Sequence, residues 1–158
     1  MKFRTTGLAS TLLITSIALC HAGDVKIKLD EAPAAVQKAI KKEAGSNKVV
    51  RVEKADEDGQ IQYEALMEKA NGKKIEFIIK ADGTLDSTEE PITLGELTGK
   101  VADTAKTTIG TGKVEAVERV TKDGTVTYEV GYKSSKGEKQ EAVISSEGKL
   151  LKHGPDTD

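Results

Sequence analysis

The sequence predicts an α+β protein made of two tandem repeats, each an N-terminal helix packed on a four-stranded antiparallel β-meander. Three observations predict this class. The stretch 48–85 returns 65 residues later as 113–150, glycine turns recur at matching positions, and apolar and polar residues alternate between the turns. A fixed period indicates one structural unit used twice. The coinciding pairs include Gly45 and Gly110, Val52 and Val117, Glu53 and Glu118, Tyr63 and Tyr128, Glu64 and Glu129, and Gly83 and Gly148.

Residues 1–22 are typical of a secretory signal peptide, with two basic residues, an apolar run over 8–19 and small residues at the end. We expect cleavage after Ala22, no membrane span in the mature chain, and a periplasmic or secreted protein. An uncleaved anchor is the first alternative, which the short, hydroxyl-interrupted run disfavours. A lipoprotein acylated at Cys20 is the second, which the large residue before that cysteine disfavours.

The mature chain, 23–158, contains no cysteine, so we expect packing alone to stabilise it in an oxidising compartment. Its charges are mixed in sign along the chain, without a basic run. This pattern disfavours a nucleic-acid partner, because a phosphate backbone is bound by clustered basic residues.

We expect five segments in all: the signal peptide, a first repeat over 23–87, a linker over 88–91, a second repeat over 92–153 and a flexible tail over 154–158. A unit of about 60 residues buries only a small core by itself. The two repeats are therefore expected to pack on each other.

One amphipathic helix is predicted over 29–45 and a second over 94–110. Pro33 suits the first helical turn, where its missing N–H leaves no hydrogen bond unmade. Gly45 and Gly110 can adopt the left-handed conformation that ends a helix. Apolar residues at helical spacing form the stripe of each helix: Ala32, Val36, Ala39 and Ile40 in the first, and Leu94, Leu97, Val101, Ala105 and Ile109 in the second.

Strands divided by glycine turns follow each helix. Asp-Gly and Asn-Gly pairs favour type I′ hairpins, in which both turn residues need a positive φ. Apolar residues three apart in 49–52 and in 114–117 break the strand alternation and predict a β-bulge in each copy. The phase of the pattern places five residues in the core: Val36, Tyr63, Phe77, Val101 and Tyr128.

These residues resemble the PepSY-like domain family, which is grouped with the β-lactamase-inhibitor proteins. The resemblance is carried by 32–36, 39–40, 63–65, 82–85, Val101, 128–130 and 148–150, and it extends over nearly the whole mature chain. It implies a secreted, non-catalytic module with a role in peptidase inhibition or regulation. Two features depart from that pattern: Thr98 replaces the helix-opening proline in the second copy, and few aromatic residues are left to anchor a partner.

Catalytic chemistry has little support in the sequence. His153 is the single histidine of the mature chain and has no cysteine to act with, so we expect a surface histidine. The acidic run 56–58 lacks the spaced ligands of a calcium loop and is interpreted as turn chemistry. We therefore predict no enzyme activity, no metal site and no cofactor, and a hydrolase is kept only as a formal third possibility.

The polar face of the predicted sheets is the one candidate binding surface. Its residues would be Gln62, Glu64, Thr127 and Glu129. The expected partner is an envelope or extracellular protein, for which a peptidase is one candidate. The alternative is a structural or small-ligand-sensing envelope protein, which the mixed lysine and glutamate surface suits equally well.

Overall fold

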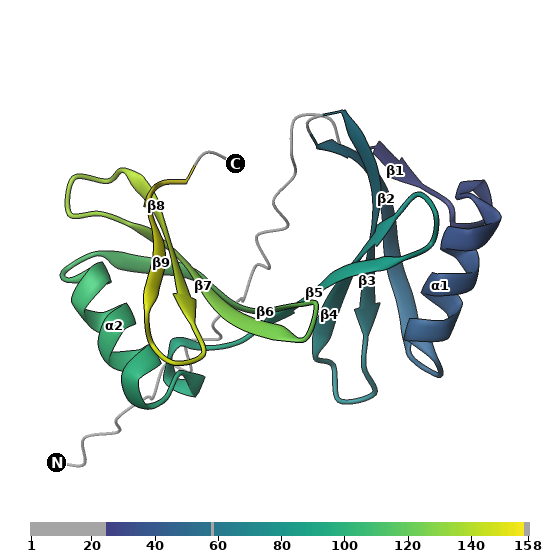
Figure 1. Ribbon diagram of the computed structural model, residues 1–158. Helices are drawn as coiled ribbons and strands as arrows, with labels where there is room; N and C mark the ends of the chain where they lie inside the picture. The colour runs from purple at the N-terminus through teal and green to yellow at the C-terminus, as the bar shows by residue number, and fades with distance from the viewer. Residues whose placement is uncertain (1–24, 58, 157–158) are drawn as a thin grey trace, which may run out of the picture.

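The computed structural model describes residues 25–57 and 59–156 of the chain. Nine strands form one antiparallel sheet in which the spatial order follows the order in sequence (Figure 1). The strands are β1 (Val25–Ile27), β2 (Lys48–Glu57), β3 (Gln60–Glu68), β4 (Lys74–Lys80), β5 (Leu85–Pro91), β6 (Lys113–Lys122), β7 (Thr125–Lys133), β8 (Lys139–Ser145) and β9 (Leu150–Pro155).

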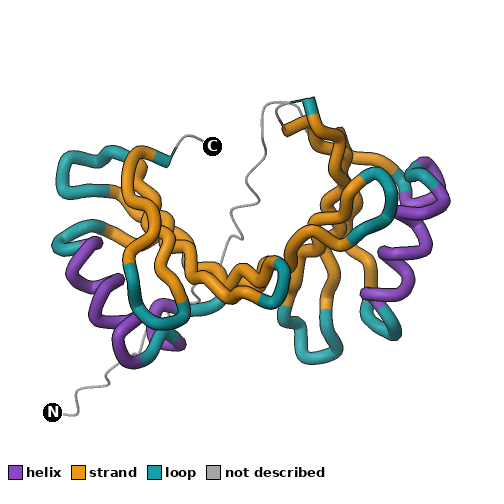
Figure 2. Tube along the Cα trace, in the orientation of Figure 1, coloured by secondary structure: helices purple, strands orange, loops and turns teal. Residues whose placement is uncertain are grey.

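The sheet bends strongly, and both helices lie on its outer side (Figure 2). Helix α1 (Ala34–Ala44) covers β3 and β4, and helix α2 (Gly99–Ile109) covers β7 and β8. We call the face under the helices the outer face and the opposite one the inner face. No helix covers the inner face within the described residues (Figure 2).

Each predicted helix is divided in two. Short 3₁₀ turns, η1 (Leu29–Glu31) and η2 (Leu94–Glu96), precede α1 and α2. The prediction of one helix over 29–45 is wrong because the residue before a proline avoids the helical region. Ala32 is indeed extended, with φ −74° and ψ 156°. Gly45 and Gly110 end the two helices with φ of 55° and 58°, as the sequence predicted.

Two hydrophobic clusters lie between the helices and the outer face. The first contains Val36, Ile40, Tyr63, Met67, Phe77 and Ile79, and the second contains Val101, Ala105, Val117, Val130, Tyr132 and Ile144. The predicted core residues Val36, Tyr63, Phe77 and Val101 are buried, whereas Tyr128 is half-buried against the second cluster. Alternation along the strands explains the burial of Tyr63 and Phe77, because every second side chain of a strand faces a helix.

The predicted fold of two helix-plus-four-strand repeats is wrong, because the chain forms a single nine-stranded sheet. Strands β5 and β6 pair directly, from Ser87 opposite Lys122 to Pro91 opposite Glu118. Residues 88–91, predicted as a linker, are therefore part of a strand hydrogen-bonded on both sides. The short strand β1 adds a ninth member at the edge, beside β2.

The predicted bulges are confirmed at equivalent places in β2 and β6. The register shifts between Val49 and Arg51, and again between Val114 and Ala116. The type I′ prediction holds for Asp123 and Gly124, which both have positive φ. In the other described turns only the glycine has a positive φ. Around Gly72, for example, the Lys69 carbonyl accepts the Gly72 N–H, as in a type I turn closed by a left-handed glycine.

The predicted signal peptide over 1–22 lies outside the described residues. At the other end, the first two residues of the predicted tail over 154–158 are paired in β9, with Gly154 opposite Glu141. Among the described residues no helix has the length and apolar content that a bilayer crossing requires.

Candidate binding face

A row of glutamates crosses the inner face, one from each of seven adjacent strands. Strand alternation places six of them opposite the helices, because a sequence neighbour of each belongs to one of the two hydrophobic clusters. Glu89 lies on the same face because it pairs directly with Glu76. We call this set the carboxylate row: Glu53, Glu64, Glu76, Glu89, Glu118, Glu129 and Glu141.

Three pairs in the carboxylate row are directly opposed across neighbouring strands. They are Glu53 with Glu64, Glu76 with Glu89, and Glu118 with Glu129. Like charges facing each other across strands destabilise a sheet. The arrangement therefore lowers the stability of the fold unless cations or protons balance it.

Cations reach this row from its two ends. We call strands β1 to β5 with α1 the first half of the molecule, and strands β6 to β9 with α2 the second half. In the first half, Arg51 places Nε 2.9 Å from Glu53 and Nη2 3.0 Å from Glu76. In the second half, Lys152 on β9 places Nζ 2.7 Å from Glu141. No basic side chain is paired with Glu89 or Glu118 in the described structure, and these two residues lie near the middle of the row.

The central carboxyl groups hold protons more tightly than an exposed glutamate. Burial, helped most by the neighbouring carboxylate of Glu118, raises the pKa of Glu89 from 4.5 to about 8. Burial and then the carboxylate of Glu129 raise the pKa of Glu118 to about 7. Buried apolar side chains on the same face exclude water around them: Leu66, Ile78 and Val120.

All four residues of the predicted binding surface lie on the inner face. Glu64 and Glu129 belong to the carboxylate row, and both raise the pKa of Glu89 from opposite sides. Gln62 and Thr127 flank the row, Gln62 opposite Ala55 and Thr127 opposite Val120. The structure thus collects the four residues on one surface, although whether that surface binds a partner stays a prediction.

The predicted surface did not include Arg51 or five glutamates of the carboxylate row: Glu53, Glu76, Glu89, Glu118 and Glu141. A signal existed for Glu118, since it coincides with Glu53 in the 65-residue period. No signal pointed to Glu89, because the segment 88–91 was predicted as a linker. Arg51 could not be assigned either, because its partner Glu76 is two strands away in the sheet.

The other predicted features have structural roles. The ring of His153 stacks on Tyr132, and its Nε2 lies 2.6 Å from the Tyr132 hydroxyl oxygen. This exposed histidine therefore links β9 to the second cluster. Asp56 accepts the Gly59 N–H at 2.9 Å, as expected for turn chemistry. The described residues contain no group of three or more histidine, cysteine or acidic side chains that could hold a metal ion.

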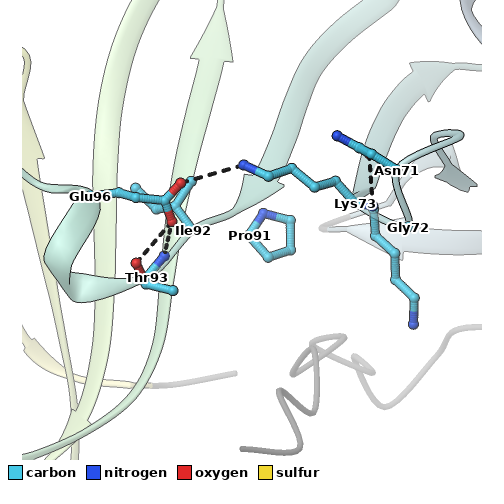
Figure 3. Close-up of a pocket in the computed structure, with 8 residues that line it drawn as sticks. Asn71, Gly72, Lys73, Pro91, Ile92, Thr93 and Glu96 are labelled. Atoms are coloured by element: carbon cyan, nitrogen blue, oxygen red, sulfur yellow. Dashed lines mark hydrogen bonds and ion pairs between the residues drawn. The ribbon is translucent and has the colours of Figure 1, made fainter.

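A separate cavity of about 360 Å³ lies between the turn that joins β3 to β4 and the segment that joins β5 to η2 (Figure 3). Lys73 Nζ approaches Glu96 Oε1 at 3.4 Å across it. The other Glu96 oxygen accepts the Thr93 N–H and hydroxyl, at 2.7 and 2.9 Å, which fixes η2. The lining residues are Asn71, Gly72, Lys73, Lys74, Pro91, Ile92, Thr93 and Glu96.

Comparison with known protein families gives no match, and comparison with curated proteins gives none either. Solved structures do match. A DUF2874 family protein from Bacteroides ovatus superposes with a TM-score of 0.66 and 21% identity, covering 80% of this chain and 89% of its own. A BLIP-like protein from Bacteroides fragilis superposes with a TM-score of 0.64 and 19% identity, covering 80% and 88%.

A third structure, from Bacteroides eggerthii and described as periplasmic, has a TM-score of 0.68 and 19% identity, covering 80% of this chain and 90% of its own. At these identities the comparisons show a shared fold alone. The BLIP-like match agrees with the predicted grouping with β-lactamase-inhibitor proteins. These three structures are not named as PepSY proteins, so that resemblance stays a prediction.

Proposed function

We propose that this chain is a periplasmic or secreted, non-catalytic module that binds a protein partner on its inner sheet face, with peptidase inhibition or regulation as its activity. The carboxylate row is the observation that supports this most strongly. Opposed like charges weaken a sheet, and local arrangements that conflict with stability are expected mainly at functional sites. The inner face is also free of helices within the described residues.

The proposed compartment is supported by the structures of similar fold that are described as periplasmic or named BLIP-like. The absence of a bilayer-spanning helix among the described residues is compatible with it. The signal peptide predicted over 1–22 would provide export.

The test uses the mature chain, 23–158, immobilised and exposed to bacterial envelope extract. We expect saturable retention of a protein partner, and loss of that retention in the Glu64→Lys, Glu129→Lys double variant, which reverses the charge at two points of the row. Lys38→Glu with Lys106→Glu is the matched control, because both lysines are exposed on the helices of the outer face. Retention that survives the inner-face changes, or that consists only of salt-labile background, contradicts the proposal.

The inhibitory activity needs its own measurement. If the retained protein is a peptidase, the purified module should lower its turnover, and the Glu64→Lys, Glu129→Lys variant should not. A retained partner without peptidase activity would refute inhibition and leave protein binding in place.

A small-ligand-sensing role is the second candidate, and the cavity beside Lys73 and Lys74 is the observation that favours it. Small anions such as phosphate should then raise the unfolding temperature of the protein. That rise should disappear in Lys74→Ala, because the exposed Lys74 carries a positive charge at the cavity wall. An unfolding temperature that does not change with anion concentration would refute this role.

A further inference from the structure

The two halves of the inner face carry the same three glutamates in the same register. In the first half, Glu53 faces Glu64 and Leu66 faces Glu76. In the second half, Glu118 faces Glu129 and Gly131 faces Glu141. The acceptor groups of the two halves therefore correspond strand by strand.

In the first half, a guanidinium group already occupies the space between these glutamates. Arg51 follows the β2 bulge and faces Leu66 across the strand pair. Its guanidinium contacts Glu53 and Glu76 at 2.9 and 3.0 Å, and its side chain is only 19% exposed. The fork of an arginine suits such a site, because one planar group can lie against two carboxylates at once. Here Nη2 donates a hydrogen bond to Glu76, while Nε forms an ion pair with Glu53.

In the second half, the side chain that would supply this group is missing. Ala116 follows the β6 bulge at the position that corresponds to Arg51, and it faces Gly131 where the first half has Leu66. A Cβ placed on Gly131 would meet nothing nearer than Ala116 Cβ, at 3.8 Å. The acceptors are thus retained, while the large side chains of Arg51 and Leu66 are replaced by those of alanine and glycine.

Lys152 contributes a positive charge beside this site. Its Nζ contacts Glu141, and its side chain is 58% exposed. An exposed ion pair of this kind is weak because water screens both charges, so it opposes an incoming cation only weakly. No basic side chain within the described residues is paired with Glu118, whose pKa is raised to about 7.

We propose that the second half of the inner face binds an arginine side chain of a partner protein, with the guanidinium between Glu118 and Glu141 above Ala116 and Gly131. The inference rests on the proposed function and specifies what that surface recognises. The contacts of Arg51 are the template for the geometry. A protein is the source of the arginine, because the site is part of a broad uncovered sheet face that gives a small molecule contacts on one side only.

The experiment uses the mature protein and a short peptide with one arginine between glycines, followed by amide chemical shifts in NMR titrations. We expect saturable shifts around Ala116, Glu118, Gly131 and Glu141, smaller ones with a lysine peptide and none with a citrulline peptide, which keeps the shape without the charge. The affinity should rise as the pH passes about 7, because the ionised Glu118 is the acceptor.

The decisive variant is Ala116→Arg, which gives the second half its own guanidinium. It should weaken binding of the arginine peptide at least about tenfold, since the peptide loses two charge-assisted hydrogen bonds. It should also raise the unfolding temperature, and this shows that the variant is folded. Thr107→Arg adds the same charge on the exposed side of α2 and should leave peptide binding unchanged.

Equal binding of the citrulline peptide, or undiminished binding to Ala116→Arg, would overturn the inference. The envelope-extract test separates its failure from that of the proposed function. A partner retained equally by the parent and by Ala116→Arg means that the module binds proteins without this arginine. A partner retained by the parent and lost in Ala116→Arg identifies a protein, and not free arginine, as the source.

Discussion

Single residues of the carboxylate row differ in how their charge is balanced. Arg51 neutralises Glu53 and Glu76 at one end, while Glu89 is surrounded by other carboxylates and by apolar side chains near the centre. The opposite shift is found where a basic partner is close, and Lys122 lowers the pKa of Asp86 in this way. Two carboxyl groups of β5, those of Asp86 and Glu89, therefore have pKa values shifted in opposite directions.

Glu89→Gln should make the stability of the protein less dependent on pH. A carboxyl whose pKa is raised from 4.5 to about 8 on folding binds more protons folded than unfolded in that interval. Its contribution to stability is thus present below pH 4.5 and is lost as the pH rises through about 8. The variant should unfold at higher urea than the parent at the upper end of this interval, by on the order of 2 kcal/mol in the free energy of unfolding.

The matched control is Glu138→Gln, at an exposed position beyond the row. Its urea midpoint should follow that of the parent at every pH. If Glu89→Gln and the parent lose stability in parallel between pH 4.5 and about 8, the raised pKa of Glu89 is refuted.

At the scale of elements, each helix is fixed by the hairpin turn that closes under it. A Cβ on Gly83 would come within 2.7 Å of the Ala35 carbonyl oxygen in α1, and one on Gly148 within 2.5 Å of Lys100 Cβ in α2. The Thr104 hydroxyl adds a hydrogen bond to the Gly148 carbonyl oxygen at 2.6 Å. Glycine is required in both turns because the backbone of each turn nearly touches the helix.

Gly83→Ala should destabilise the protein more than Gly72→Ala. Both glycines have positive φ, 86° and 77°, but a Cβ on Gly72 would meet nothing within 4 Å. Gly72→Ala should therefore show the backbone strain alone, about 1–2 kcal/mol, whereas Gly83→Ala should add an overpacking cost of about 1–3 kcal/mol. Urea denaturation of the two variants measures the difference, and equal losses would show that α1 yields to the added methyl group.

For the whole molecule, the central feature is the pairing of β5 with β6. It joins two halves whose hydrophobic clusters share no residue. Glu90, 8% exposed, contacts Lys69 Nζ at 3.1 Å and also Arg119 on β6, and Asp86 contacts Lys122 on β6 at 2.6 Å. These ion pairs link the first half to the second across the β5–β6 pairing.

Unfolding should be cooperative over both halves. Val130→Ala removes buried volume from the second cluster, where Val130 is fully buried, and should lower the free energy of unfolding by roughly 1–3 kcal/mol. Because β5 and β6 are one ladder, hydrogen exchange under mild denaturant should speed up in β3 and β4 as well as in β7 and β8. Val50→Ala, at a 40% exposed position, is the control and should leave exchange unchanged. Faster exchange confined to β7 and β8 would show that the halves unfold separately.

Local patterns in the sequence were sufficient for most elements. The bulges before Arg51 and Ala116, the helix ends at Gly45 and Gly110, and the phase of the buried side chains were all predicted, because each depends on residues close together in the chain. The division of the first helix at Ala32 also has a local cause, because the residue before Pro33 avoids the helical region. The four residues of the predicted binding surface were placed on the correct face by the same two-residue period.

The sequence by itself determined most of the helices, strands and turns, and which strand face is polar, because those properties follow from local spacing. Only the tertiary structure decided that the polar segment 88–91, predicted as a linker, continues the fourth predicted strand, which starts at Leu85. Its pairing with β6 depends on residues more than 25 positions away, and it contributes no residue to the hydrophobic clusters that could reveal it. The same pairing gathers seven glutamates on one face, where burial and the neighbouring carboxylates raise the pKa of Glu89 and of Glu118.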